Sequence, residues 1–502
     1  MTQTYDVIII GGGGSGLATG LSAAQNGASV ILFEKRPLLG GSTGIAVGSF
    51  TANRTVLQQR QGIDDSPEDH DEDAGKFGPP EYQARNNGPL RRYFLAHTAT
   101  TLDWLMDMGL TFYGPSPEPP NRVARMHNVV PNAKAYIAVL QSRYLHYGGE
   151  TVCNAACEEL ILENGRVIGV WVNIRGNCMR FQATKGVVLA TGDYTNSSQL
   201  ISRYKGRRFA DVEGINPHST GEGHLLAEKA GARLLNMDIT YGPEIRFIPP
   251  PRKPFSQLLP ASGPAARILG TLLPLVPSWI INAMVKRLLV TWQHPEDALF
   301  EDGAILVNCR GERFCNEKIS PEREIAIAVQ PEKTAYILLD ARLAGKYSKW
   351  PHYISTAPEI AYAYVNEYFR LRPDITTVVE DLAGLSDMLK IPIESLKKTI
   401  VDYNQYASGR LEDPFGRKGD RNLMTDGRWV LLGPAKAYFT TTEGSISINK
   451  SFQALDLKGT PIEGLFAVGT CGMGGMILWG HGLHIAWAIT SGRMVGEQLA
   501  GK

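Results

Sequence analysis

Cysteine is scarce in this sequence, and no two cysteines form a CxxC pair. Six cysteines among 502 residues are too few for the disulfide framework that holds small secreted domains together, and their spacing does not fit a zinc site. We therefore expect a cytoplasmic, reducing setting and no bound metal. The polar start of the chain, Met1 to Tyr5, also lacks the basic segment and cleavage pattern of a signal peptide.

An excess of charge of either sign is missing as well. Lys and Arg number 51 and Asp and Glu number 50, which leaves a formal net charge of +1. This balance argues against a nucleic-acid partner. The length exceeds what one ordinary core requires, so we expect two or three folding units.

The N-terminal residues contain a complete βαβ pattern with a glycine-rich turn. The apolar run Tyr5–Ile10 reads as a buried parallel strand, Gly11–Gly16 satisfies G-x-G-x-x-G, and an Ala-rich helix follows. A second strand, Ser29–Phe33, ends at Glu34, eighteen residues after Gly16. This context is typical of a Rossmann-type dinucleotide site, with the pyrophosphate at the helix N-terminus and the acidic residue at the ribose.

Two further glycine-rich segments favour FAD over NAD. Gly40–Gly44 offers small residues for backbone contact with a pyrophosphate or a flavin ring, and Gly464–Thr470 reads as a late strand that enters a glycine loop. The second segment predicts that the C-terminal part of the chain returns to the same cofactor.

The middle of the chain divides into segments of different character. Residues 61–88 are crowded with Asp and Glu and predict an exposed acidic loop, whereas 151–191 predicts short strands with a turn at Asn164-Gly165. Residues 249–292 are rich in proline and apolar side chains. From 304 to 428 the pattern is mixed, with strands near 304–308 and 335–340 and helices near 357–371 and 394–407.

Several motifs together resemble the flavoprotein family of fumarate reductase and succinate dehydrogenase, which includes the 3-ketosteroid dehydrogenases and urocanate reductase. Besides Gly11–Gly16, Glu34 and Gly40–Ser42, the motifs are Ala190–Gly192, Thr220–Gly223, Gly311–Glu317 and Pro461–Gly469. The resemblance implies an α/β fold in which both chain ends form a FAD-binding domain (1–243 and 429–502). An inserted α+β capping domain (244–428, with the apolar 249–292) is implied between them, with substrate bound where the two meet.

The same resemblance implies the residues that bind FAD. They are Gly11, Gly13, Gly14, Ser15, Gly16, Glu34, Lys35, Gly40, Gly41, Ser42, Thr43, Gly44, Ala190, Thr191, Gly192, Gly469, Thr470 and Gly482. The histidine that succinate dehydrogenases bond to FAD falls near Ser42, so we expect non-covalent FAD.

Departures from the family pattern narrow the range of substrates that we expect. The resemblance associates a histidine and an Asn-Arg-x-Gly-Gly motif with a dicarboxylate substrate. The histidine is missing from the segment Phe439–Gly444, and the motif is missing from Ile477–Gly482. Because a carboxylate in an apolar site without a cation is costly, a fumarate-like substrate is disfavoured. The C-terminal region, with Gly474-Gly475, is most similar to the 3-ketosteroid dehydrogenases, although Trp479 stands where that group has a tyrosine.

The proton-transfer residue of the family lies shortly after the Asn-Glu at 316–317. This chain has Pro321 at that offset and Arg323 two residues later, so Arg323 is our candidate acid–base, with a surface ion pair as the alternative. Further candidate catalytic residues are Tyr241, Trp479, His481 and His484, and a packed histidine is the alternative for each of the last two.

These patterns predict a FAD-dependent dehydrogenase or reductase that acts on a CH–CH bond next to a carbonyl. An apolar, steroid-like enone or ketone is the expected substrate, with an electron donor or acceptor that the sequence does not identify. The alternatives are a urocanate- or fumarate-type reductase of a small polar enoate, and a flavin-binding protein without catalysis. For 258–292 we weigh ordinary core or an oligomer contact against a lid with peripheral membrane contact.

Overall fold

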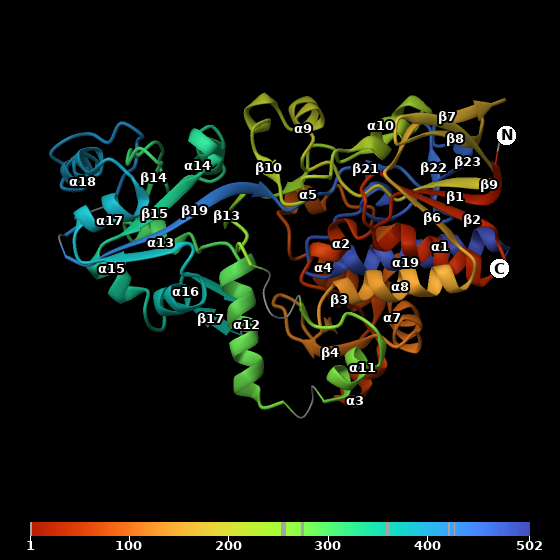
Figure 1. Ribbon diagram of the computed structural model, residues 1–502, viewed down its shortest axis with the longest axis horizontal. Helices are drawn as coiled ribbons and strands as arrows, with labels where there is room; N and C mark the ends of the chain where they lie inside the picture. The colour runs from red at the N-terminus through yellow and green to blue at the C-terminus, as the bar shows by residue number, and fades with distance from the viewer. Residues whose placement is uncertain are drawn as a thin grey trace.

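The computed structural model describes residues 3–252, 258–272, 276–357, 361–419, 422–425 and 427–501. Two bodies lie side by side along the longest axis, and both ends of the chain belong to the same body (Figure 1). A separate hydrophobic core fills the centre of that body, and further cores fill the second one. The predicted α/β architecture is confirmed, and the two bodies are called below by the names that the sequence leads us to expect, the FAD-binding domain and the capping domain.

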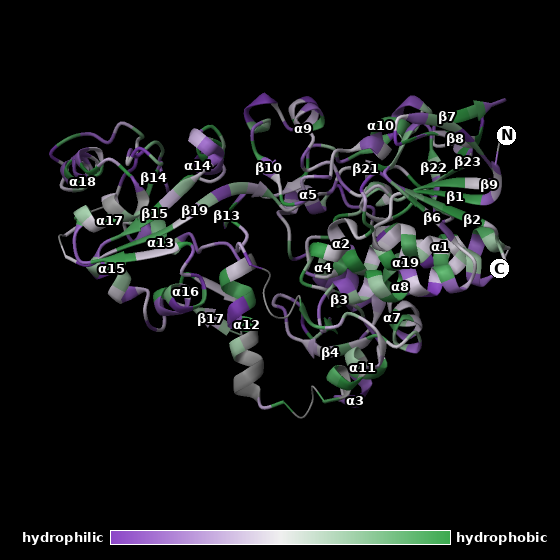
Figure 2. Cartoon of the chain, viewed as in Figure 1, coloured by the Kyte–Doolittle hydropathy of each residue, from purple (hydrophilic) through white to green (hydrophobic). Residues whose placement is uncertain are grey.

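The FAD-binding domain is built on an eight-stranded, mostly parallel sheet. Strand β1 lies between β2 and β9 and runs parallel to both, while β23 runs parallel to β9. Figure 2 shows the apolar character of β1 and β2, and Val7, Ile8 and Ile9 are fully buried. Across the sheet the path is β22 (Gln453–Leu455), β23 (Pro461–Ala467), β9 (Asn177–Leu189), β1 (Gln3–Ile10), β2 (Val30–Glu34) and β6 (Glu150–Cys153).

Three helices, α1 (Gly14–Gln25), α8 (Lys134–His146) and α19 (Leu483–Ala500), cover one face of this sheet (Figure 1). Small residues allow α1 and α19 to approach closely. A Cβ added at Gly492 would lie 2.4 Å from the Ser15 carbonyl oxygen. This contact joins the two ends of the chain, as the sequence predicts.

The remaining two strands of the sheet form a hairpin. Strands β7 (Ala155–Glu163) and β8 (Arg166–Ile174) meet at Asn164 and Gly165, whose φ angles of 51° and 80° suit a tight hairpin turn. The predicted turn at Asn164-Gly165 is therefore confirmed.

The capping domain contains a six-stranded sheet built around the long strand β19 (Trp429–Phe439). Because β19 pairs with capping strands, residues 429–439 lie in the capping sheet, about ten residues beyond the boundary expected from the sequence. Strand β10 (Glu213–Gly214) also pairs with β19. The other strands are β13 (Glu244–Phe247), β14 (Ile305–Val307), β15 (Ala335–Leu339) and β18 (Thr376–Val379).

Helices surround the capping sheet. They are α14 (Glu322–Ala328), α15 (Ala341–Lys346), α16 (Val365–Leu371), α17 (Leu382–Leu389) and α18 (Ile393–Ala407). The helix expected near 357–371 is shorter than predicted, because residues 361–363 pair with 355–357 as a small antiparallel ribbon, β16 and β17. The helix expected near 394–407 is confirmed as α18.

The prediction of an exposed acidic loop at 61–88 is wrong. The segment forms α4 (Pro67–Ala74) and α5 (Pro80–Gln83), and Ser66 caps α4 through its side chain. Two carboxylates, Asp65 and Asp73, are buried against Arg125, whose Nη2 and Nη1 lie 2.7 and 2.6 Å from them. Burial alone would raise the pKa of Asp73, but hydrogen bonds from Lys76, Arg122 and Arg125 hold it below its usual value.

The segment that links the two domains contains α11 (Gly263–Leu272) and α12 (Ser278–Trp292). Helix α12 packs along the capping domain, where Leu289 and Val290 are buried and Lys286 pairs with Glu367, whereas α11 lies against the FAD-binding domain near β4 (Thr111–Ser116) (Figure 1). The side chains of Trp279 and Ile280 lie outside the described residues. Within the described part of the chain, no helix is long and apolar enough to cross a bilayer.

Candidate functional site

Four loops gather at the carboxyl ends of the parallel strands. They follow β1, β2, β9 and β23 and contain the segments 11–16, 35–44, 190–197 and 468–482. The carboxyl edge of an open parallel sheet is where such folds bind their ligands. Every cofactor residue expected from the sequence lies in one of these loops or at its margin.

The glycines of the first loop have distinct structural roles. A Cβ at Gly16 would lie 1.9 Å from the Gly11 carbonyl oxygen, and one at Gly11, where φ is 110°, would lie 2.4 Å from the Ala190 carbonyl oxygen. These two glycines are required by backbone packing. At Gly13, in contrast, the nearest atom is the Gly41 Cα at 3.9 Å, so the protein itself leaves the space beside Gly13 open.

The open space has the features that a dinucleotide requires. Gly13 precedes the first turn of α1, whose unpaired amides favour an anion. Gly41 (φ 51°) faces Gly13 from the second loop, and a Cβ at Gly192 (φ 79°) would meet no atom within 4 Å. The residues therefore fit a pyrophosphate held by backbone groups.

The acidic residue at the end of β2 is held against the loop. Glu34 accepts hydrogen bonds from the backbone amides of Gly12 (2.8 Å) and Arg36 (2.9 Å). The neighbouring Lys35 donates to Glu222 and Thr220, while Ser42 accepts from Asn216. The assignment of Lys35 and Ser42 to the cofactor stays a prediction.

The C-terminal loop packs directly on the N-terminal one. A Cβ at Gly469 would lie 2.6 Å from the Ser15 hydroxyl, and the Gly469 carbonyl accepts a hydrogen bond from the Trp487 indole. Gly482, with φ 81°, caps α19 beside Ser49 and Thr51. The late glycine loop predicted from the sequence thus shares the carboxyl edge with the first.

Residues 474–478 of this loop are held by polar side chains from the segment 61–88 and by Asn236. Asn87 and Asn236 donate to the carbonyls of Gly474 and Gly475, respectively. Asn86 accepts from the Ile477 amide. The sequence could not show this, because the partners are between 239 and 391 residues apart.

An aromatic cluster lies beside the loop. The Trp479 indole makes edge-to-face contacts with Tyr82 of α5 and Tyr241 of β12 (Thr240–Tyr241), each with ring centroids 5.5 Å apart. The indole N–H of Trp479 is buried and has no hydrogen-bond partner among the described residues, and neither has the amide nitrogen of Gln83. Burial raises the pKa of Tyr241 to about 12, so its phenol is neutral at physiological pH.

Charged side chains border the aromatic cluster. Arg246 of β13 pairs with Glu244 at 2.8 Å, and the exposed His481 pairs with Glu118 through its Nδ1. The hydrogen bond to Glu118 raises the pKa of His481. Arg246, Glu118 and Tyr82 were missed from the sequence; only the alternation in 244–247 hinted that Arg246 shares a strand face with Glu244.

A second histidine has a more enclosed setting. The Nε2 of His484, in the first turn of α19, lies 3.1 Å from Oε1 of the fully buried Glu443. Glu443 follows β20 (Thr441–Thr442), which pairs with the strand that carries Tyr241. The structure thus brings Tyr241, Trp479, His481 and His484 to one region of the molecule.

Arg323 lies elsewhere, in α14 of the capping domain. Its guanidinium donates to Glu324 (2.6 Å), to Asp297 (2.5 Å) and to the Glu317 carbonyl. No contact with the loop at 473–482 is among its described interactions. These contacts agree with the alternative that Arg323 forms ion pairs, and its acid–base role stays a prediction.

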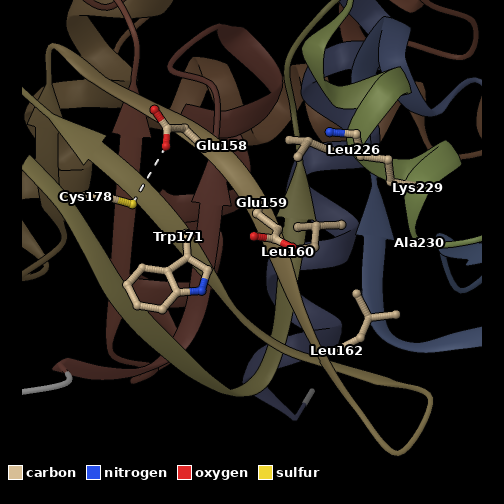
Figure 3. Close-up of a pocket in the computed structure, with 9 residues that line it drawn as sticks. All are labelled: Glu158, Glu159, Leu160, Leu162, Trp171, Cys178, Leu226, Lys229 and Ala230. Carbon is tan, nitrogen blue, oxygen red and sulfur yellow. Dashed lines mark hydrogen bonds between the residues drawn. The ribbon is translucent and has the colours of Figure 1, made fainter. Parts of the chain in front are cut away.

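Two surface pockets lie away from these loops. One, of about 580 Å³, is lined by residues of β7 and β8 with Cys178 and α10 (Glu222–Lys229), as Figure 3 shows. The other, of about 700 Å³, lies between α18 and residues 408–423 of the capping domain. Neither contains a residue expected to bind the cofactor.

Comparison with known proteins gives a consistent picture. The chain matches the family model described as FAD binding domain over residues 6–250 and 279–481. It is 25% identical to a fumarate reductase (cytochrome) of Shewanella frigidimarina, covering 99% of this chain and 77% of that protein. It is also 25% identical to the vinyl phenol reductase of Lactiplantibacillus plantarum, covering 99% and 97% of the two chains.

Solved structures show the same fold. The open conformation of a flavocytochrome c3 fumarate reductase superimposes with a TM-score of 0.71 at 25% identity, covering 99% of this chain and 78% of that one. The 3-ketosteroid Δ1-dehydrogenase of Sterolibacterium denitrificans gives a TM-score of 0.64 at 18% identity, covering 99% and 100%, which shows likeness of fold alone.

Proposed function

The chain belongs to the FAD-binding family of oxidoreductases that includes fumarate reductase flavoproteins, and from this premise we propose that it transfers hydride between FAD and a carbon–carbon bond of a planar, uncharged compound next to a carbonyl. Membership confirms the predicted cofactor, FAD, and the predicted class, a FAD-dependent oxidoreductase of CH–CH groups. The nature of the substrate is the proposal developed here.

The observation that carries this proposal is the buried, unpartnered indole N–H of Trp479 between two tyrosine rings. A buried donor without an acceptor costs about 1–3 kcal/mol. A ligand with a carbonyl oxygen would remove that cost, and its flat apolar part would pack against the rings of Tyr82 and Tyr241. An enone or a conjugated ketone has both features.

The charges around the cluster support an uncharged ligand. From the sequence no cation is expected at the site, but Arg246 lies near Tyr241. It is already paired with Glu244, and His481 is paired with Glu118. Because each of these two cations has its own carboxylate, neither offers a dicarboxylate an unpaired positive charge, which supports the predicted preference for an apolar substrate.

Bound FAD supplies hydride transfer at its N5 atom. The residues of this chain would hold the pyrophosphate beside Gly13 and Gly41, position the unsaturated compound at the aromatic cluster, and polarise its carbonyl through the Trp479 N–H. The electron donor or acceptor is a further partner in this proposal.

A second candidate is a reductase of a small polar enoate. Arg246 favours it, because a substrate carboxylate could displace Glu244 from the guanidinium. One of the relatives named above is a fumarate reductase.

Substrate trials on photoreduced holoenzyme separate these candidates. We expect reoxidation of the flavin by conjugated enones, including ketosteroids with a conjugated enone, and at least tenfold slower reoxidation by fumarate or urocanate. Faster reaction with the dicarboxylate would establish the enoate alternative. If the flavin is reduced but no unsaturated compound reoxidises it, the protein is a flavin-binding module.

The Trp479→Phe variant tests the indole donor. It retains a ring for packing but lacks the N–H, so we expect the KM of a carbonyl substrate to rise about 3- to 10-fold, corresponding to one neutral hydrogen bond of about 0.5–1.5 kcal/mol. The matched Tyr82→Phe variant keeps its ring and should bind the same substrate within about twofold. Equal KM values for Trp479→Phe and the wild type would remove the indole from recognition.

Non-covalent attachment of FAD has a direct check. Ser42 occupies the position of the covalent histidine, and its hydroxyl accepts a hydrogen bond from Asn216. Acid precipitation of the purified yellow protein should leave the flavin in the supernatant. A coloured pellet would show a covalent bond that the sequence does not predict.

Peripheral membrane contact through 258–292 is the last part of this proposal. Leu258, Ile268 and Leu272 are 65%, 58% and 50% exposed. Exposed apolar side chains of this kind suit contact with a bilayer surface, from which a lipophilic substrate would arrive.

A further inference from the structure

A histidine and two carboxylates lie together beneath the loop that carries Trp479. They come from three distant parts of the chain: Asp193 follows β9, Glu443 follows β20, and His484 lies in α19. Asp193 is 3% exposed and the Glu443 side chain is fully buried. Such a concentration of titratable groups at a cofactor edge is a feature of functional sites.

The contacts within this group are specific. One oxygen of Glu443 accepts the Leu478 amide at 3.0 Å, and the other lies 3.1 Å from Nε2 of His484. Neither of those two facing atoms has a hydrogen-bond partner among the described residues. At a separation of 3.1 Å, the imidazole and the carboxylate are close enough to exchange a proton.

Charge balance explains why the pair holds a proton. A buried carboxylate without a cation is strongly disfavoured, and His484 is the titratable base that faces Glu443. Asp193 faces the same histidine; burial raises its pKa, while hydrogen bonds from Thr195 and the charge of His484 lower it. Two acidic side chains, Glu443 and Asp193, therefore lie near His484.

The pair also connects the site to solvent. The His484 side chain is 23% exposed, whereas Glu443 is enclosed and bonded to the residue next to Trp479. A proton can enter through the imidazole and be held on the enclosed side, one residue from the ring that the proposed function places against the substrate.

Building on the proposed function, we propose that the Glu443–His484 pair delivers the proton to the substrate carbon adjacent to the one that receives hydride. In the reducing direction the π bond breaks and two C–H bonds form: hydride brings the electron pair and one hydrogen, and the pair brings the second hydrogen as H⁺. His484 then regains a proton from water. Asp193 is a positioning residue whose carboxylate interacts electrostatically with the imidazole.

This assignment moves the acid–base role away from Arg323. The guanidinium of Arg323 is held by Asp297 and Glu324 in the capping domain, and an arginine is a poor proton donor at neutral pH. An imidazole titrates in the physiological range and so suits the task.

The test uses the FAD-loaded protein and separates the two half-reactions. In Glu443→Gln and His484→Gln, photoreduction and reoxidation by oxygen should match the wild type, while reoxidation by the unsaturated substrate should slow about a hundredfold or more. His484→Asn and Glu443→Leu serve where a first variant loses FAD. Substrate reoxidation within threefold of the wild type in folded, FAD-loaded variants would overturn the assignment.

A second measurement does not depend on turnover. In selectively labelled holoprotein, the NMR signals of the His484 imidazole should change in Glu443→Gln, because an amide replaces the carboxylate that lies 3.1 Å from its Nε2. Unchanged imidazole signals would also overturn the pairing. If the wild type reacts with no unsaturated compound, the proposed function fails; if it reacts and the variants react equally fast, only the proton assignment fails.

Discussion

The Gly13→Val variant is expected to fold normally and to be purified without FAD. The backbone at Gly13 (φ −81°, ψ −171°) is open to any residue, and the nearest atom to an added Cβ is 3.9 Å away. The protein alone therefore tolerates the side chain. The cofactor would not, because the branched side chain fills the space in which the pyrophosphate approaches the amides of α1.

The measurement is the ratio of flavin to protein absorbance, together with circular dichroism of the purified protein. Gly16→Val is the matched control in the same motif, since its Cβ would lie 1.9 Å from the Gly11 carbonyl oxygen. That variant should lose both the fold and the flavin. Stoichiometric FAD in a folded Gly13→Val protein would contradict the site assigned between Gly13 and Gly41.

The Arg125→Met variant is expected to lower the free energy of unfolding by about 3–5 kcal/mol, the usual cost of leaving buried charges without their partner. Arg125 is fully buried and pairs with Asp65 and Asp73, which are 1% and 0% exposed at their side chains. Removing it leaves Asp65 without a cation. Urea unfolding followed by fluorescence measures the change.

A solvent-exposed ion pair provides the comparison. Arg180 pairs with Glu163 at 37% and 58% exposure, and Arg180→Met should change stability by less than about 1 kcal/mol. Adding Asp65→Asn to Arg125→Met should restore part of the loss, because it removes the unpaired charge. An effect of Arg125→Met no larger than that of Arg180→Met would show that the buried cluster does not stabilise the domain.

Local patterns of the sequence predicted much of the fold. The strand–glycine–helix–strand order from Tyr5 to Glu34 and the hairpin at Asn164-Gly165 depend on residues close together in the chain, and both were found as predicted. The acidic segment at 61–88 was misassigned because composition alone indicated solvent exposure. Its partner Arg125 lies 60 residues from Asp65, so nothing nearby signals that the carboxylates are buried.

The candidate site likewise has one part that the sequence predicts and another that only the tertiary structure reveals. Sequence by itself determined the dinucleotide motif, because Gly11 and Gly16 are needed by backbone packing and Gly13 by the approach of the cofactor, all within one βαβ unit and its neighbours. The surroundings of Trp479 and His484 were decided by tertiary structure alone. Tyr82, Glu443 and Arg246 come from separate segments of the two domains, and only the docking of loop 474–478 against α5, β12 and β20 brings their rings and charges together. The requirements of the backbone depend on residues that are close together in the chain. The pairing of buried charges and rings depends instead on distant segments that meet only when the chain folds.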